Sequence, residues 1–132
     1  MTLPIISGYA AAILGFLQIG LMVTVGNARR EADVSLGDGG NDALLMKIRR
    51  HGNLTENAPL FLILLSFLEI TGGPVIAVLA LASIFITARL SHAFALSGPN
   101  KPLAARAGGA LGTILGIVGT AGMLAWHLST LN

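Results

Sequence analysis

The sequence predicts an all-α integral membrane protein, a four-helix bundle in which a single domain covers residues 1–132. Two observations lead to this prediction. Of the 132 residues, 54% are hydrophobic and 11% are charged, whereas about a quarter of an average soluble domain is charged. The apolar residues also gather into segments that can each be extended to the roughly 20 residues of a membrane-crossing helix.

The first two predicted helices cover about residues 3–27 and 43–71. No basic region precedes the first, so we expect it to remain in the protein and not to be cleaved as a signal peptide. The connection VSLGDGGNDA is rich in Gly and Asp, and Asn41 or Asp42 is placed to cap the second helix.

The third and fourth predicted helices cover about residues 75–97 and 103–129. TGGP at 71–74 predicts a tight turn before the third helix, and SGPNKP at 97–102 ends it. The chain has no cysteine, which excludes disulfides and thiolate metal sites. Its histidines lie on separate helices, so no metal site is expected, and no nucleic-acid patch is present.

The lysines and arginines lie on one side of this predicted topology. All 8 fall in or near the first and third connections, and basic connections stay cytoplasmic under the positive-inside rule. With an even number of helices, both termini are then expected to be periplasmic. The short connections are typical of a bacterial inner membrane protein.

The second and third helices must take polar residues into the membrane. The part of the second helix without charged or amide side chains before Glu69 runs only from Ala58 to Leu68, about half the hydrocarbon thickness at 1.5 Å per residue. Glu56 on this helix and Arg89 on the next must therefore enter the bilayer. A charge at that depth costs about 2.5 to 3.5 kcal/mol and normally faces a protein interior or a wet cavity.

Counting from the tight turn at 71–74 suggests partners for these groups. Glu56 lies 15 residues before it and Arg89 lies 15 residues after it, which places both at the same depth, and Asn53 matches His92 in the same way. We expect Glu56 and Arg89 to be partners within one subunit or between subunits, directly or through a ligand. Glu56→Gln should then weaken the assembly more than Glu69→Gln. A purely structural bridge would also explain this pair.

Cations exceed anions at the mouth of this predicted polar site. Such an excess suits a ligand with carboxylate groups, because guanidinium groups bind carboxylates with two parallel hydrogen bonds. Arginines that extend to lipid headgroups are the alternative explanation. The residues concerned are Arg29, Arg30, Arg49, Arg50, Arg89 and Arg106.

The segment RRHGNLTENAPLF resembles the second-helix signature of the MAPEG family, the membrane-associated proteins in eicosanoid and glutathione metabolism. In that signature an Arg, four residues later an Asn and three residues later a Glu precede a Pro. The matching residues here are Arg49, Asn53, Glu56 and Pro59. NARREADVS resembles the end of the family's first helix, and ARLSHAF followed by Arg106 resembles its third helix and the next connection.

The resemblance implies a homotrimer that binds glutathione as a co-substrate between subunits, in a cleft open to the cytoplasm. By position, Arg106 is the catalytic residue that stabilises the thiolate. A cation beside the sulfur lowers a thiol pKa from about 8.5 toward neutrality. The glutathione-binding residues are Arg29 or Arg30, Arg49, Asn53 and Glu56, together with Arg89 and His92.

Departures from the family pattern narrow the predicted function. His92 and Leu96 stand where the eicosanoid synthases carry tyrosines, and Ala107 replaces a serine of the prostaglandin-forming members. We therefore expect a transferase or peroxidase that acts on small lipophilic electrophiles among the membrane lipids. The alternative is a non-enzymatic protein of the same fold that binds another anion or lipid, or serves in assembly.

Other residues fit packing or surface roles. Glycines at 108, 112 and 116 share one face of the fourth helix and predict close helix packing. Glu69 and His127 lie near the periplasmic ends of their helices. We expect both side chains to be solvated or to contact headgroups.

Overall fold

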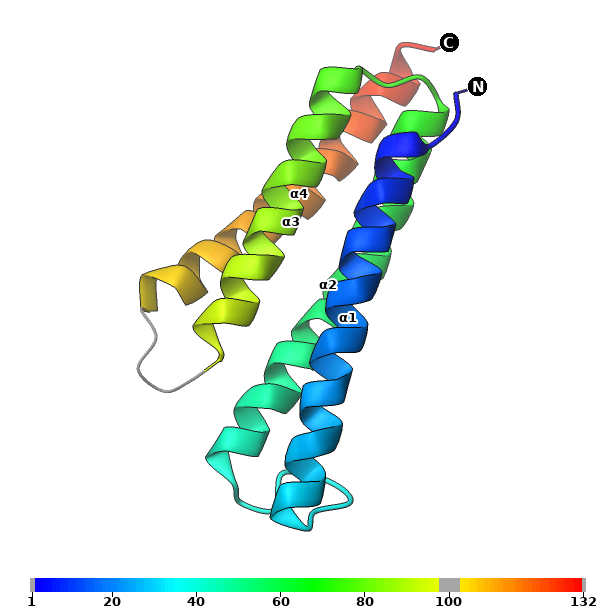
Figure 1. The fold of residues 1–132 in the computed structure, drawn as a ribbon. Helices are drawn as coiled ribbons and strands as arrows, with labels where there is room; N and C mark the ends of the chain where they lie inside the picture. Colours follow the sequence, from blue (N-terminus) through cyan, green and yellow to red (C-terminus); the bar gives the residue numbers. More distant parts are fainter. Residues whose placement is uncertain (1, 98–102, 132) are drawn as a thin grey trace.

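In the part of the chain that the structure describes, residues 2–97 and 103–131, the computed structural model contains four long helices (Figure 1). The all-α fold predicted from the sequence is confirmed. Each helix is long and apolar enough to cross a membrane, which is consistent with the predicted membrane bundle. The helices are α1 (Ile5–Ala32), α2 (Asp42–Ile70), α3 (Val75–Ala95) and α4 (Leu103–Ser129).

The first helix is longer than the apolar pattern indicates. α1 continues beyond residue 27 to Ala32, so Arg29 and Arg30 lie in its last turn. Cations there interact favourably with the negative end of the helix dipole. Asp33 then adopts the left-handed conformation with φ 52° and ends the helix, its N–H directed at the carbonyl of Arg30.

Local signals set the boundaries of α2. Of the two alternatives for its N-cap, the structure selects Asn41, whose side-chain oxygen accepts a 3.0 Å hydrogen bond from the N–H of Leu44. At the other end, Gly72 has φ 87° and the N–H of Gly73 donates to the carbonyl of Leu68 at 2.8 Å. A positive φ favours glycine at position 72. At position 73 an added Cβ would lie 2.7 Å from the Leu68 carbonyl oxygen, so both glycines permit the tight turn into α3.

The helices form two hairpins joined along α2. α1 packs along α2, α3 packs along α4, and α2 contacts all three other helices. The α2–α3 turn lies at the same end as residues 2 and 131, hereafter the turn end (Figure 1). Residues 33–41, between α1 and α2, lie at the opposite end, hereafter the connection end.

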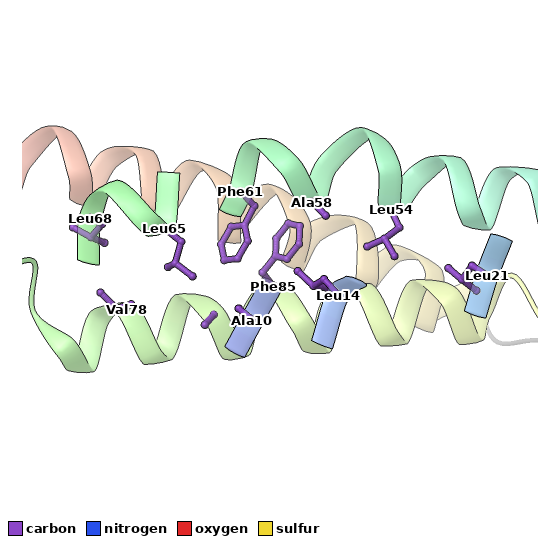
Figure 2. Close-up of a cluster of buried hydrophobic side chains, with 11 residues drawn as sticks. Ala10, Leu14, Leu21, Leu54, Ala58, Phe61, Leu65, Leu68, Val78 and Phe85 are labelled. Carbon is purple, nitrogen blue, oxygen red and sulfur yellow. The ribbon is translucent and has the colours of Figure 1, made fainter. Parts of the chain in front are cut away.

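The hydrophobic core runs along the seam between α1, α2 and α3 (Figure 2). At its centre the rings of Phe61 and Phe85 stack with centroids 3.9 Å apart and an angle of 3° between planes. α4 packs through small residues instead, and Thr113 and Thr120 are buried there. Each threonine donates to a carbonyl one turn earlier, at 2.7 and 2.6 Å, which satisfies its hydroxyl within the bundle.

Large apolar side chains also cover much of the outer surface. Phe16 on α1 is 81% exposed and Ile76 on α3 is 83% exposed. A soluble monomer rarely exposes apolar surface on this scale. The outer surface of the bundle therefore suits contact with lipid.

Candidate functional site

The candidate site lies on the polar face of α2, in the half of the bundle nearer the connection end. Arg49 and Glu56 are exposed on this face, and Asn53 between them is partly buried. Within the ranges that the structure describes, the side chains of Arg49 and Glu56 make no hydrogen bond or ion pair to the protein. Both are therefore available to a ligand or to another subunit.

Arg89 is the most buried charged residue near this face, with 3% of its surface exposed. One terminal nitrogen donates to the side-chain oxygen of Asn53 and, at 3.5 Å, to its carbonyl. The other donates to the carbonyl of Gly109 on α4 at 2.9 Å. The guanidinium carbon lies 5.7 Å from the centre of the Phe85 ring. Arg89 thus joins α2, α3 and α4 in one contact.

Within one subunit Arg89 does not pair directly with Glu56, and pairing between subunits or through a ligand stays a prediction. No ion pair joins them, and Glu56 faces outward. Equal depth did not decide the partner, because Asn53 lies on the inward side of α2 and the arginine side chain reaches it across one helical turn. A neutral acceptor also avoids the cost of burying a carboxylate.

His92 is buried with 7% of its surface exposed, and it faces α4. A side chain added at Gly109 would come within 2.7 Å of the His92 Cβ and 2.8 Å of its backbone nitrogen. The absence of a side chain at Gly109 therefore permits this approach. Arg106 lies one helical turn before Gly109 on α4, and its side chain is exposed.

The two arginines at the end of α1 differ in their environment. Arg29 donates from one terminal nitrogen to the carbonyl of Gly37 at 2.8 Å and, more weakly, to that of Ser35 at 3.4 Å. Arg30 is exposed and its guanidinium makes no hydrogen bond to the described protein. Of the alternatives offered by the sequence, Arg30 is thus the free cation, while Arg29 orders the connection.

The structure also joins α1 to α2 through polar residues, of which the sequence analysis named only Arg50. The Gln18 amide nitrogen on α1 lies 2.8 Å from the Nε2 atom of His51 and 2.5 Å from the hydroxyl of Thr55. Arg50 donates to the hydroxyl of Thr24 at 3.0 Å. These contacts join α1 to α2 by hydrogen bonds inside the membrane span. A lone glutamine in an apolar helix was the available signal.

Glu69 and His127 are not free at the turn end, contrary to the sequence-based expectation. Glu69 is 8% exposed and accepts hydrogen bonds from the N–H groups of Ile6 and Ser7, each at 2.8 Å, and from the Ser7 hydroxyl at 2.6 Å. This carboxylate therefore caps the N-terminus of α1, where a negative charge is favourable. His127 Nε2 lies 3.1 Å from the carbonyl of Thr71.

The described residues contain no cluster of side chains suited to bind a metal ion. Among residues 2–97 and 103–131, no three His, Asp or Glu side chains gather closely enough to hold a metal ion. The polar groups of the candidate site are guanidinium, imidazole, amide and carboxylate groups. They can bind an anionic or zwitterionic ligand by hydrogen bonds and charge.

Comparison with known proteins identifies the family. The sequence profile of the MAPEG family matches residues 7–126. The inner membrane protein YecN of Escherichia coli, from strains K12 and O6:H1, is 30% identical over 87 residues. That match covers 66% of this chain and 66% of the relative. No solved structure gave a significant match.

The matched region begins in the first turn of α1 and ends near the C-terminus of α4, so it includes all four helices and every residue of the candidate site. The chain belongs to the MAPEG family.

Proposed function

We propose that this protein is a glutathione-dependent membrane transferase or peroxidase that acts on lipophilic electrophiles. The observation that carries the proposal is the exposed polar face of α2, where Arg49 and Glu56 lack protein partners and flank the partly buried Asn53. Unpaired charges of both signs at membrane depth are costly. A zwitterionic peptide ligand would satisfy both.

The chemistry of glutathione fits these groups one by one. Its two carboxylates suit guanidinium groups, and Arg49 and Arg30 are the exposed arginines that offer them. Its ammonium group suits the carboxylate of Glu56. Asn53 is left to read an amide of the peptide.

Arg106 is the proposed thiol-activating residue. It is exposed in the first turns of α4 and has no carboxylate partner within the described residues. A guanidinium beside the glutathione sulfur would favour the thiolate, which is the nucleophile. We assign Arg89 and His92 to the buried wall behind this site.

Two reactions are open to such a thiolate. In conjugation its sulfur forms a bond to carbon, the leaving group departs with its electron pair, and the thiol proton passes to solvent. In peroxide reduction the thiolate attacks a peroxide oxygen and the O–O bond breaks, which gives glutathione sulfenic acid and an alkoxide that takes up a proton and leaves as an alcohol. The thiol of a second glutathione then attacks the sulfenic sulfur, and the disulfide forms as the sulfenic oxygen leaves as water.

The proposed assembly is a homotrimer with glutathione between subunits. The support is that one subunit leaves Arg49 and Glu56 uncovered, so a neighbouring subunit is needed to enclose a ligand. We place the protein in a bacterial inner membrane, as for the relative from Escherichia coli. The basic connection end then faces the cytoplasm and both termini face the periplasm.

Calorimetric titration of the detergent-solubilised protein with glutathione tests the proposal. We expect saturable binding and turnover with a halodinitrobenzene or a lipid hydroperoxide. Arg106→Ala should lower turnover with less effect on affinity, because a thiolate-stabilising cation acts on the reactive form. If millimolar glutathione gave no heat of binding and did not raise the melting temperature, the proposed function would be rejected.

A second candidate is a non-enzymatic MAPEG protein that binds another anion or a lipid headgroup. It is favoured by one observation, that His92 and Leu96 are each 7% exposed and buried against the bundle. As histidine and leucine they also offer no hydroxyl at the two positions where the eicosanoid synthases carry tyrosine. Saturable binding of a phospholipid headgroup without turnover would favour this candidate.

A further inference from the structure

We propose that Arg89 is a positioning residue that fixes how Asn53 meets its ligand, so that Asn53 presents hydrogen-bond donors and recognises an acceptor oxygen. This inference rests on the proposed function, because it specifies which kind of glutathione atom Asn53 binds. Arg89 would act at the site through Asn53, without any contact to the ligand.

The first step is the orientation of the Asn53 amide. A guanidinium has only donors, so the Asn53 atom that contacts Arg89 must be the oxygen, as the structure has it. The usual ambiguity between the oxygen and nitrogen of an asparagine is therefore removed by chemistry. The NH2 group is left as the part of the side chain that can contact a ligand.

The second step is access to that NH2 group. It donates to no other residue within the described ranges, and it is not among their buried unpaired atoms, which are on Gln18, Arg50 and Arg89. Asn53 itself is only partly buried. The NH2 group is thus accessible, and it suits a carbonyl or carboxylate oxygen.

The third step is the rigidity of Arg89. The residue is 3% exposed, and its two terminal nitrogens bind acceptors on two different helices, Asn53 on α2 and Gly109 on α4. Its Nε atom is buried as well, without a hydrogen-bond partner among the described residues. Rotation of the guanidinium toward a ligand would cost both contacts.

This bridge also sets the distance between two parts of the proposed site. Gly109 lies one helical turn after Arg106, so the guanidinium that orients Asn53 also holds the start of α4. Peptide recognition on α2 and thiol activation on α4 would then share one buried support. Lysine could not replace it, because an ammonium is a compact charge without the planar fork of arginine.

The test compares two Asn→Asp substitutions four residues apart in the full-length protein in detergent. Asn53→Asp keeps the oxygen that Arg89 binds and adds a counter-charge, but it removes the NH2 group. Asn57→Asp, the control, removes a donor that bonds to the Asn53 carbonyl at 2.7 Å. We expect Asn53→Asp to melt at or above the wild-type temperature, and Asn57→Asp to melt below it.

Glutathione titration supplies the second readout. Asn53→Asp should bind glutathione at least about tenfold more weakly, since a donor is lost and a carboxylate faces the ligand oxygen. Arg89→Lys should weaken glutathione binding and lower the melting temperature. If the contact between Arg89 and Asn53 were purely structural, Asn53→Asp would not lose affinity for glutathione while keeping its melting temperature.

Two results would overturn the inference. Asn53→Asp that melts as low as Asn57→Asp would show that Arg89 does not hold the Asn53 oxygen. Asn53→Asp that binds glutathione as tightly as wild type would show that the ligand does not use the NH2 group. Wild-type protein without saturable glutathione binding would reject the proposed function and, with it, the ligand role, and the melting comparison would still decide whether the bridge exists.

Discussion

The two ends of the bundle use their charged groups in opposite ways. At the turn end, the carboxylate of Glu69 accepts three hydrogen bonds from the first turn of α1, and His127 contacts the α2–α3 turn. Toward the connection end, Arg30, Arg49 and Glu56 are exposed, and their side chains make no hydrogen bond or ion pair to the described protein.

The contrast indicates where function resides. A polar side chain in an apolar chain is costly, so each one must be explained by the fold or by a ligand. At the turn end the fold explains Glu69. Toward the connection end the fold explains Arg89, but it leaves the polar face of α2 unexplained.

The largest expected effect is that of Glu69→Gln. Loss of the charged acceptor weakens several bonds at the N-terminus of α1, and we expect the free energy of unfolding to fall by about 2 to 4 kcal/mol. Glu56→Gln should change it by less than about 0.5 kcal/mol, because Glu56 is exposed. Thermal unfolding in detergent measures both.

This ranking reverses the expectation drawn from the sequence, which placed the more damaging substitution at Glu56. Equal melting of the two variants would remove the contrast between the ends. Melting that is lower for Glu56→Gln would indicate that Glu56 has a structural partner in a neighbouring subunit.

The next effect concerns the packing of α3 on α4. Gly109→Ala would place a carbon 2.7 Å from the His92 Cβ and 2.8 Å from its backbone nitrogen, and overpacking of this kind costs about 1 to 3 kcal/mol. Gly108→Ala is the matched control, since nothing lies within 4 Å of its added carbon. We expect Gly108→Ala to be neutral or slightly stabilising.

A melting temperature for Gly109→Ala that equals the value for Gly108→Ala would mean that α3 and α4 can separate without cost. The support of Arg89 by the carbonyl of Gly109 would then be weak as well. Glutathione binding by Gly109→Ala gives an independent check of that support.

The sequence predicted the helices well, because length and apolar character depend on local composition. The Asn41 cap and the TGGP turn were readable for the same reason. Partners across helices were not. The bond between Glu69 and Ser7 joins residues 62 positions apart, and nothing in either segment specifies the other.

The candidate site shows the same limit. Counting residues from the turn brings Arg89 within one helical turn of its partner on α2. It does not give the rotation of α2, and rotation decides between Asn53 and Glu56. Likewise the pattern ARR at the end of α1 does not tell Arg29 from Arg30. Only the path of the next residues shows that Arg29 donates to the carbonyl of Gly37.

A smaller and more specific contrast is expected for the adjacent arginines of α2. Arg49→Ala should leave stability unchanged and weaken glutathione binding about tenfold or more, because it removes a charged donor from the proposed ligand. Arg50→Ala should lower stability and leave glutathione binding unchanged. Arg50 is partly buried and donates to Thr24 at 3.0 Å, so its loss should cost about 1 kcal/mol of stability.

Paired titration and melting of the two variants measure this contrast. If Arg50→Ala weakened binding as much as Arg49→Ala, the polar face would extend further around α2 than proposed. If neither weakened binding, the ligand would not bind through this end of α2.

The smallest effect distinguishes the adjacent arginines of α1. Arg29→Ala removes donors to the carbonyls of Ser35 and Gly37 and should lower stability by about 1 kcal/mol. Arg30→Ala should change stability by less than about 0.5 kcal/mol but weaken glutathione binding, because its exposed guanidinium is free to bind a carboxylate. Chemical denaturation and titration of both variants separate the two roles. Weaker binding for Arg29→Ala alone would transfer the ligand contact to Arg29, and the connection end would then use the same arginine for folding and for binding.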